Sequence, residues 1–175
     1  MTSNRKNITI VDGYNVINAW SNLLEISKSS LEAARDKLID EMAEYKSLSG
    51  EEIIIVFDAY NLDRPKETII EKYGIKIVYT KRFQTADTYI EKQILDLSHK
   101  HNLKIVTDDG QIQILATSKG ASRITSNELR SDIYNNQKKI NRTRKKDFNR
   151  NFKSFPLSKE MIDKIDQIKE DLDKD

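Results

Sequence analysis

NITIVDGYN, at residues 7–15, is an apolar run that ends at Asp12 and is followed by glycine. Four further apolar runs follow in the first 125 residues, at 53–57 (IIIVF), 75–79 (IKIVY), 103–106 (LKIV) and 121–124 (ASRI). All are rich in Ile and Val, except for the short last one, and the first, second and fourth are nearly continuous. Such runs are typical of strands that are buried on both faces of a parallel sheet.

Helical patterns lie between these runs. Ser29 followed by Glu32 is a capping-box signal, and apolar residues at helical spacing come after it. Two more helices are expected between the later strands, one capped by Thr85 and one opened by Asp109 or Gly110. Strands that alternate with helices predict β-α-β units. The expected fold class is therefore α/β, a three-layer α/β/α domain built on a parallel sheet.

The segment between the first strand and the first helix is expected to be a loop of about 15 residues. Connections between strands and helices are usually shorter, and long ones often carry function. Tyr14 and Trp20 lie in this segment. A base-stacking role is one interpretation of these aromatic rings, and for Tyr14 ordinary packing is the alternative that we favour.

The chain changes character after residue 125. A long helix that begins apolar and becomes basic is predicted over residues 126–150, and an amphipathic helix over 158–172. We therefore divide the chain into a core, residues 1–125, and a helical extension, residues 126–175, which is first basic and then acidic. We expect this extension to pack on the core.

Composition excludes several classes of protein. The chain has no cysteine, so disulfides and thiolate metal sites are impossible, which favours a cytoplasmic location. No apolar run is long enough to span a membrane, and the first residues do not resemble a secretory signal. The glycine-rich phosphate-binding motifs and the G-x-S-x-G elbow are absent, so neither a nucleotide cofactor nor a serine nucleophile is expected.

Acidic residues follow the predicted strands at equivalent positions. Asp12, Asp58 and Asp109 each come at or just after a strand, and Asp87 opens the helix after the third strand, with Glu91 one turn later. Parallel sheets bind ligands at the edge where their strands end. Carboxylates gathered there repel one another unless a cation is bound, and all-oxygen ligands select Mg²⁺ or Mn²⁺. Metal-assisted hydrolysis of a phosphodiester is the chemistry that such a site favours.

Each of these positions also has an ordinary interpretation. A single Asp at a strand end is most often a turn or helix-cap residue, although four at equivalent ends are harder to explain in that way. Glu91 alone is more typical of a solvated helix face. Asp108 is an alternative to Asp109 as ligand, because one of two adjacent side chains faces away from the site.

Basic residues indicate a polyanionic partner. Residues 123–155 carry ten Lys and Arg against three Asp and Glu, whereas the preceding residues are nearly neutral. Phosphate contact is the interpretation that we favour over a plain solvated helix. Lys81 and Arg82 are expected beside the acids at the strand ends, where they either hold the substrate backbone or pair with those acids. The basic stretch comprises Lys138, Lys139, Arg142, Arg144, Lys145 and Lys146.

Four motifs occur in an order that resembles a known family. They are VDGYN at 11–15, VFDA at 56–59, TAD at 85–87 with Ile90 and Glu91 after it, and TDD at 107–109. In this order they resemble the YacP-like group within the NYN branch of the PIN-like nucleases. The resemblance covers roughly residues 7–150. The chain departs from it where Gln84 and Thr88 stand in places that are often acidic, and where Asp108 precedes Asp109.

This resemblance implies a function. It implies metal-binding or catalytic roles for Asp12, Asp58, Asp87 and Asp109, and it matches Asn15 to the Asn of the first motif. An amide there either holds a ligand carboxylate or contacts phosphate, with a cap or turn role as an equal alternative. The resemblance further implies endoribonuclease activity on messenger RNA and association with the ribosome.

Three hypotheses therefore follow. The first is an Mg²⁺- or Mn²⁺-dependent endoribonuclease in which a metal-activated water attacks the phosphodiester. The second is a non-catalytic RNA- or ribosome-binding module on the same fold, which the basic stretch would suit. The third is a phospho-acceptor signalling domain, which ranks far behind because Gly13 follows Asp12 where an acid pair is expected.

Overall fold

The computed structural model describes residues 5–59 and 66–154, together with 159, 163, 164, 166 and 167; the side chains of 148–154 are not described. The chain forms two compact units, Met1–Asn136 and Gln137–Asp175. Most of the helix predicted over 158–172 lies outside the described residues. None of the helices in the described ranges combines the length and apolar content that crossing a membrane requires.

Six strands form one sheet in the first unit, in the order β3-β4-β2-β1-β5-β6. All but β3 run parallel to one another. The parallel strands are β1 (Asn7–Asp12), β2 (Glu52–Phe57), β4 (Ile75–Tyr79), β5 (Asn102–Val106) and β6 (Ser122–Ile124). They coincide with the five predicted runs to within a residue at either end.

The sheet also contains a strand that the sequence did not predict. The strand β3 (Thr68–Lys72) lies antiparallel to β4 at the edge of the sheet. Tyr73 and Gly74 join the two strands, and both have positive φ, as the tight turns of hairpins require. Because β3 is exposed on both faces, it lacks the hydrophobic periodicity by which strands are recognised. The sheet is therefore mixed rather than wholly parallel.

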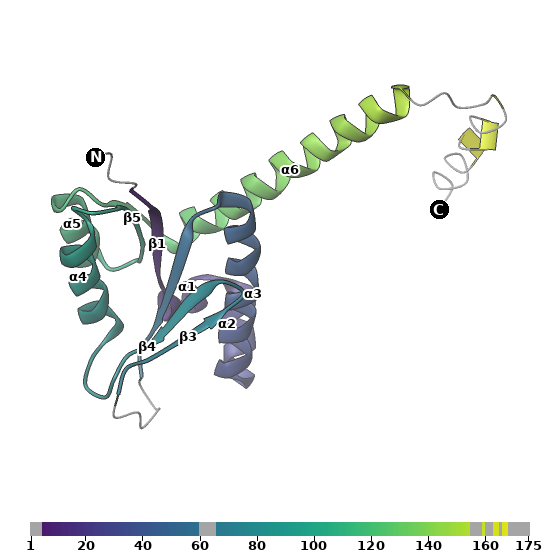
Figure 1. Ribbon diagram of the computed structural model, residues 1–175. Coiled ribbons are helices and arrows are strands. Elements are labelled where there is room, and N and C mark those ends of the chain that lie inside the picture. Colours follow the sequence, from purple (N-terminus) through teal and green to yellow (C-terminus); the bar gives the residue numbers. More distant parts are fainter. Residues whose placement is uncertain (1–4, 60–65, 155–158, 160–162, 165, 168–175) are drawn as a thin grey trace. The chain divides into compact units, whose positions relative to one another are not determined.

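Helices cover both faces of the sheet and make three layers. Figure 1 shows α4 and α5 on one face and α1, α2 and α3 on the other. The helices are α1 (Gly13–Ala19), α2 (Ser21–Ser29), α3 (Leu31–Ser49), α4 (Ala86–Leu97), α5 (Gly110–Ser118) and α6 (Ser126–Ser154). The predicted caps Thr85 and Asp109 are confirmed, because each side chain accepts a backbone N–H in the first turn of its helix. Ser30, rather than Ser29, caps α3.

Two hydrophobic cores result from alternation along the strands. In β2, Ile55 and Phe57 face the layer of α1–α3, whereas Ile54 and Val56 face α4 and α5. Leu129 and Ile133, in the first turns of α6, belong to the first of these cores. The compact unit therefore extends past residue 125, and the packing of the later residues on it stays a prediction.

The prediction of a long loop after the first strand is wrong. Residues 13–29 form α1 and α2, and Asp12 caps α1 by accepting the N–H of Asn15. Trp20 is almost fully buried, and its indole N–H donates to the carbonyl of Ser126 at 2.8 Å. Apolar residues at helical spacing, Val16, Ile17, Trp20 and Leu23, were the signal for these two helices.

Candidate active site

The predicted site acids follow neighbouring strands of the sheet. Asp12 is the last residue of β1, Asp58 comes directly after β2, and Asp109 comes three residues after β5. Strand β1 lies between β2 and β5, so the chain reverses its order of strands at this place. Ligands of open α/β sheets bind at such a switch point, beyond the carboxyl ends of the strands. The sheet thus brings these three positions to one edge, the lower edge in Figure 1.

Asp12 is the most deeply buried of these acids, with 4% of its surface exposed. Its carboxylate accepts hydrogen bonds from the backbone and the side-chain amide of Asn15. The pKa of Asp12 is raised to about 6, mainly by burial and additionally by the charges of Asp87 and Asp108, against the lowering effect of the hydrogen bonds from Asn15. The Asn15 amide also lies 3.5 Å from the Thr107 hydroxyl, which follows β5.

Asp87, the second residue of α4, faces the same group of charges. Burial is the main cause of its raised pKa, and repulsion by Asp109, Glu91 and Asp58 adds to it. The repulsions on Asp87 and Asp12 together link the acids of β1, β2, α4 and the segment after β5. The six carboxylates therefore form one electrostatic cluster, which we call the acidic edge: Asp12, Asp58, Asp87, Glu91, Asp108 and Asp109.

Asp108 and Asp109 have different hydrogen-bond partners. Asp109 caps α5, since its Oδ1 accepts the N–H groups of Gln111 at 2.7 Å and Ile112 at 3.2 Å. Asp108 instead accepts the N–H of Ser126, at the start of α6, at 3.0 Å. Both acids act on the acidic edge, because Asp108 repels Asp12 and Asp109 repels Asp87. The choice between them as ligand therefore stays open.

The donors of the acidic edge suit a hard divalent cation. Among the described residues, no three acids or histidines lie close enough to hold an ion between them. Mg²⁺ does not need such a cage, because it keeps several of its waters and is commonly held by one or two carboxylates. Repulsion among the acids is the cost that a bound cation would remove. The residues therefore fit Mg²⁺ or Mn²⁺ held partly through water.

Two further predicted residues lie in the loop that leads to Asp87, and a third packs on the residue before Asp58. Lys81 and Arg82 are exposed in the loop between β4 and α4, and the Arg82 guanidinium lies 5.0 Å from the ring centroid of Phe83. Tyr14 packs against the Phe57 ring at 5.3 Å, and its hydroxyl accepts from Arg35 at 3.0 Å. A base contact by Tyr14 stays a prediction.

The basic stretch lies on the part of α6 that belongs to the second unit. All six of its Lys and Arg side chains are exposed. Because they extend into solvent from a helix, they suit contact with a phosphate backbone. The stretch comprises Lys138, Lys139, Arg142, Arg144, Lys145 and Lys146.

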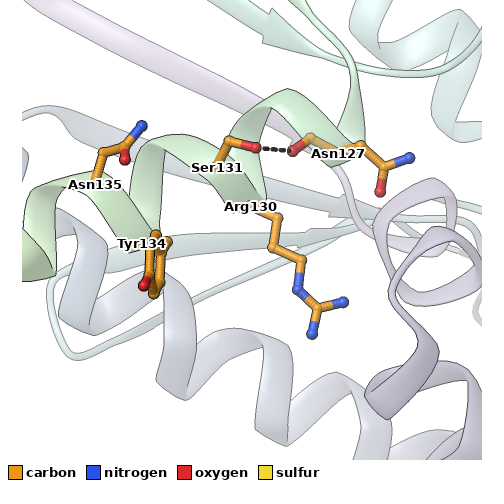
Figure 2. Close-up of a pocket in the computed structure, with 5 residues that line it drawn as sticks. All are labelled: Asn127, Arg130, Ser131, Tyr134 and Asn135. Atoms are coloured by element: carbon orange, nitrogen blue, oxygen red, sulfur yellow. Dashed lines mark hydrogen bonds between the residues drawn. The ribbon is translucent and has the colours of Figure 1, made fainter.

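Sequence patterns did not single out a hollow beside the start of α6. It has a volume of about 510 Å³ and contains no carboxylate in its lining. Figure 2 shows Arg130 and Tyr134 pointing to the same side of the helix, and the Arg130 guanidinium lies 5.6 Å from the centroid of the Trp20 ring. The lining residues are Asn127, Arg130, Ser131, Tyr134 and Asn135.

Comparison with known proteins places the chain in a family. A model of the YacP-like NYN domain matches residues 9–170. The chain belongs to the YacP-like NYN domain family. The Bacillus subtilis (strain 168) protein named "Uncharacterized protein YacP" is 36% identical over 136 residues, which are 77% of this chain and 79% of that protein. The family predicted from the four motifs is therefore confirmed.

Solved structures agree with this assignment. A crystal structure of Rae1 (YacP) from Bacillus subtilis matches with a TM-score of 0.65 and 32% identity, covering 95% of this chain and 97% of that one. A tryptophan-to-leucine mutant of Rae1 (YacP) matches with a TM-score of 0.66 and 33% identity, covering 89% and 90%. The three-layer α/β fold is confirmed, and membership of the NYN family supports a nuclease-like role.

Proposed function

We propose that this YacP-like NYN protein is an Mg²⁺- or Mn²⁺-dependent endoribonuclease that cleaves messenger RNA in association with the ribosome, in the cytoplasm. The observation that carries the proposal is the acidic edge. Carboxylates from four separate segments meet at the switch point of the sheet, where burial, and their mutual repulsion in addition, raises the pKa of Asp12 and of Asp87. Groups held together against their own repulsion are characteristic of functional sites.

The roles of the acids follow from their positions. Asp12, Asp87 and Asp109 are the proposed main ligands, and Asp58 contributes directly or through a water. When bound, the cation supplies charge that stabilises the phosphate and favours ionisation of the attacking water. Asn15 holds the Asp12 carboxylate by two hydrogen bonds, and thereby fixes the orientation of one ligand.

The products proposed are a 5′-phosphate and a 3′-hydroxyl, as attack by water leaves them. Cleavage through the 2′-hydroxyl commonly uses histidine as acid and base. The chain has two histidines, His99 and His101, and both precede β5 at the opposite edge of the sheet. The acidic edge therefore favours attack by water.

The substrate is proposed from charge. Lys81 and Arg82 lie in the loop that leads to Asp87, where they suit the phosphates that flank the scissile bond. The exposed basic stretch of α6 suits a longer polyanion, such as messenger RNA or the RNA of a ribosome. Association with the ribosome rests further on the likeness of the four motifs to those of the YacP-like group.

The experiment that tests the proposal is cleavage of a messenger RNA under active translation by the wild type, Asp12→Asn and Asp87→Asn. Discrete cuts with 5′-phosphate ends are expected for the wild type, and a loss on the order of 100-fold or more for both variants. Asp96→Asn, which changes an exposed acid near the end of α4, is the matched control and should cut normally. Equal cutting by all four proteins would contradict the proposal.

Metal dependence needs a separate measurement, because translation itself requires Mg²⁺. Binding of Mg²⁺ and Mn²⁺ to the purified protein, followed by titration calorimetry, should be detected for the wild type and Asp96→Asn and lost in Asp12→Asn. Cutting by the wild type together with unchanged metal binding in Asp12→Asn would refute the assignment of ligands.

A non-catalytic RNA- or ribosome-binding module is the second candidate. The exposed basic stretch favours it, and so do Gln84 and Thr88, which stand where the family often has acids. This hypothesis predicts binding to RNA or ribosomes that is lost when the Lys and Arg residues of the basic stretch are replaced by neutral ones. It predicts no RNA cleavage that depends on the acids. Cleavage lost in Asp12→Asn and Asp87→Asn alone would exclude it.

A further inference from the structure

The loop between β4 and α4 carries an exposed aromatic ring beside the acidic edge. Phe83 is 95% exposed, the highest value among the large hydrophobic residues that the structure describes. Its backbone is also unusual, with φ at 64°, a conformation that a bulky residue seldom adopts. Burial of the ring would be favourable, yet the loop holds it in water at a conformational cost. Exposed, strained positions of this kind are concentrated at binding sites.

The loop is anchored where the acids are. The N–H of Thr80, directly after β4, donates to the carbonyl of Phe57, and the Thr80 hydroxyl accepts the N–H of Ala59 at 3.0 Å. Thr80 thus bonds to the residue before Asp58 and to the residue after it. At its other end the loop runs into the cap of α4, two residues before Asp87. Figure 1 shows this loop at the lower left, on the side where the strands end.

The neighbours of the ring are cationic. The N–H of Gln84 donates to the carbonyl of Lys81 at 3.0 Å, which closes a turn around Arg82 and Phe83. The Arg82 guanidinium lies 5.0 Å from the ring centroid. An aromatic face next to a guanidinium offers two partners to a nucleotide, a surface for the base and a charge for the phosphate.

We infer that Phe83 and Arg82 form a stacking platform for an unpaired base of the RNA that reaches the acidic edge. This inference rests on the proposed function, because it assigns a base-binding position beside the same site. In a duplex each base face is covered by its neighbours, so no base is available to Phe83. Stacking on an aromatic ring is tolerant of sequence, since every base has a π-face.

The chain contains a matched control at the other end of β4. Tyr73 is 63% exposed, has φ at 55°, and lies with its ring centroid 5.3 Å from the Lys72 ammonium. It shares the exposure, the backbone conformation and the cationic neighbour of Phe83. It precedes β4, however, and so lies at the edge of the sheet opposite the acids. A general effect of exposed aromatic rings would appear equally at both residues.

The experiment measures binding and stacking apart from cleavage. A 12-nucleotide RNA with 2-aminopurine at its centre is titrated in Mg²⁺ with the full-length Asp87→Asn protein, which leaves the RNA uncut. Binding is followed by anisotropy of an end label, and stacking by quenching of 2-aminopurine. Second-site changes Phe83→Ala, Phe83→Trp and Tyr73→Ala are compared, and the same sequence is presented as a duplex.

The expected result has five parts. The single strand binds and its 2-aminopurine is quenched, whereas Phe83→Ala weakens binding on the order of ten-fold and abolishes quenching. Phe83→Trp retains both signals, and Tyr73→Ala changes neither. The duplex binds more weakly and is insensitive to Phe83. Because Phe83 is so exposed, none of these changes removes core packing.

Several results would overturn the inference: binding of the single strand that Phe83→Ala leaves intact, equal loss in Tyr73→Ala, or no preference over the duplex. Phe83-dependent docking of a protein without an RNA effect would overturn it as well. Failure of the proposed function is a different result. In that case the single strand stacks on Phe83, but the wild-type protein shows no RNA cleavage that is lost in Asp12→Asn and Asp87→Asn.

Discussion

The Asp108 carboxylate accepts the backbone N–H of Ser126 at 3.0 Å, and so joins the end of β5 to the first residue of α6. The adjacent Asp109 points its Oδ1 at the first turn of α5 instead. Two neighbouring acids thus accept N–H groups at the starts of two different helices, and both also act on the acidic edge. Their bonds to these N–H groups and their charges can be separated by mutation, because the side-chain oxygen of asparagine accepts such a bond as well as that of aspartate does.

Asp109→Asn is expected to keep the cap of α5 and to lose the charge. The free energy of unfolding should change by less than about 0.5 kcal/mol, while RNA cleavage under the proposed function falls on the order of 100-fold. Asp108→Ala is expected to lose the bond to Ser126, at a cost of about 1 kcal/mol. Urea denaturation and the cleavage assay measure the two effects. Should Asp108→Asn, rather than Asp109→Asn, abolish cleavage, Asp108 is the ligand.

Asp12→Asn is expected to stabilise the metal-free protein in a manner that depends on pH. The pKa of Asp12 is raised from 3.8 to about 6 in the folded state, mainly by burial, so the folded protein binds the proton more tightly than the unfolded chain. The stability that this proton contributes is complete below pH 4 and is lost as pH rises through 6. The loss amounts to roughly 3 kcal/mol.

Urea denaturation in EDTA at pH 4, 5, 6 and 7.5 measures this dependence. The difference in unfolding free energy between Asp12→Asn and the wild type should move in favour of the variant across this range. Its offset at pH 4 reports the altered hydrogen bonds to Asn15. Asp96→Asn serves as the control on an exposed acid of α4. A difference that is constant from pH 4 to 7.5 would contradict the raised pKa.

Mg²⁺ is expected to stabilise the folded protein more strongly at pH 7.5 than at pH 5. The ligand carboxylates must be deprotonated to bind a cation, and Asp12 is protonated at the lower pH. At a concentration 100 times the dissociation constant, binding contributes about 2.7 kcal/mol, which raises the melting temperature of a chain of this size by about 5–10 °C. Differential scanning fluorimetry at constant ionic strength tests this, and an equal shift in Asp87→Asn would argue against the acidic edge as the site.

Gly13→Ala is expected to destabilise the fold beside the site. A Cβ on Gly13 would lie 2.3 Å from Cε1 and 2.5 Å from Cδ1 of Phe57. The Phe57 ring is fully buried and packed between Tyr14 and Tyr79, so it has little room to move. Overpacking of this kind costs about 1–3 kcal/mol in urea denaturation. Gly110→Ala is the control, because nothing lies within 4 Å of its Cβ position, and an equal loss there would rule out the steric explanation.

Much of the fold could be predicted from local sequence. The runs that became β1, β2 and β5 are buried on both faces over most of their length, so apolar side chains fill most of their positions and mark the strands clearly. The caps Thr85 and Asp109 are also local, since each side chain bonds to the backbone two or three residues later. The strand β3 was not predicted, because an exposed edge strand does not need alternating apolar residues.

By itself the sequence determined that acids stand at the carboxyl ends of buried parallel strands. Each apolar run marks its own strand, and the acid that follows the run therefore marks the end of that strand. Only the tertiary structure decided that β1 lies between β2 and β5, and hence that the charges of Asp87 and Asp108 contribute to the raised pKa of Asp12. The exposure of Phe83 beside these acids was decided there too. Strand order and burial depend on contacts between segments far apart in the chain, and no local pattern contains them.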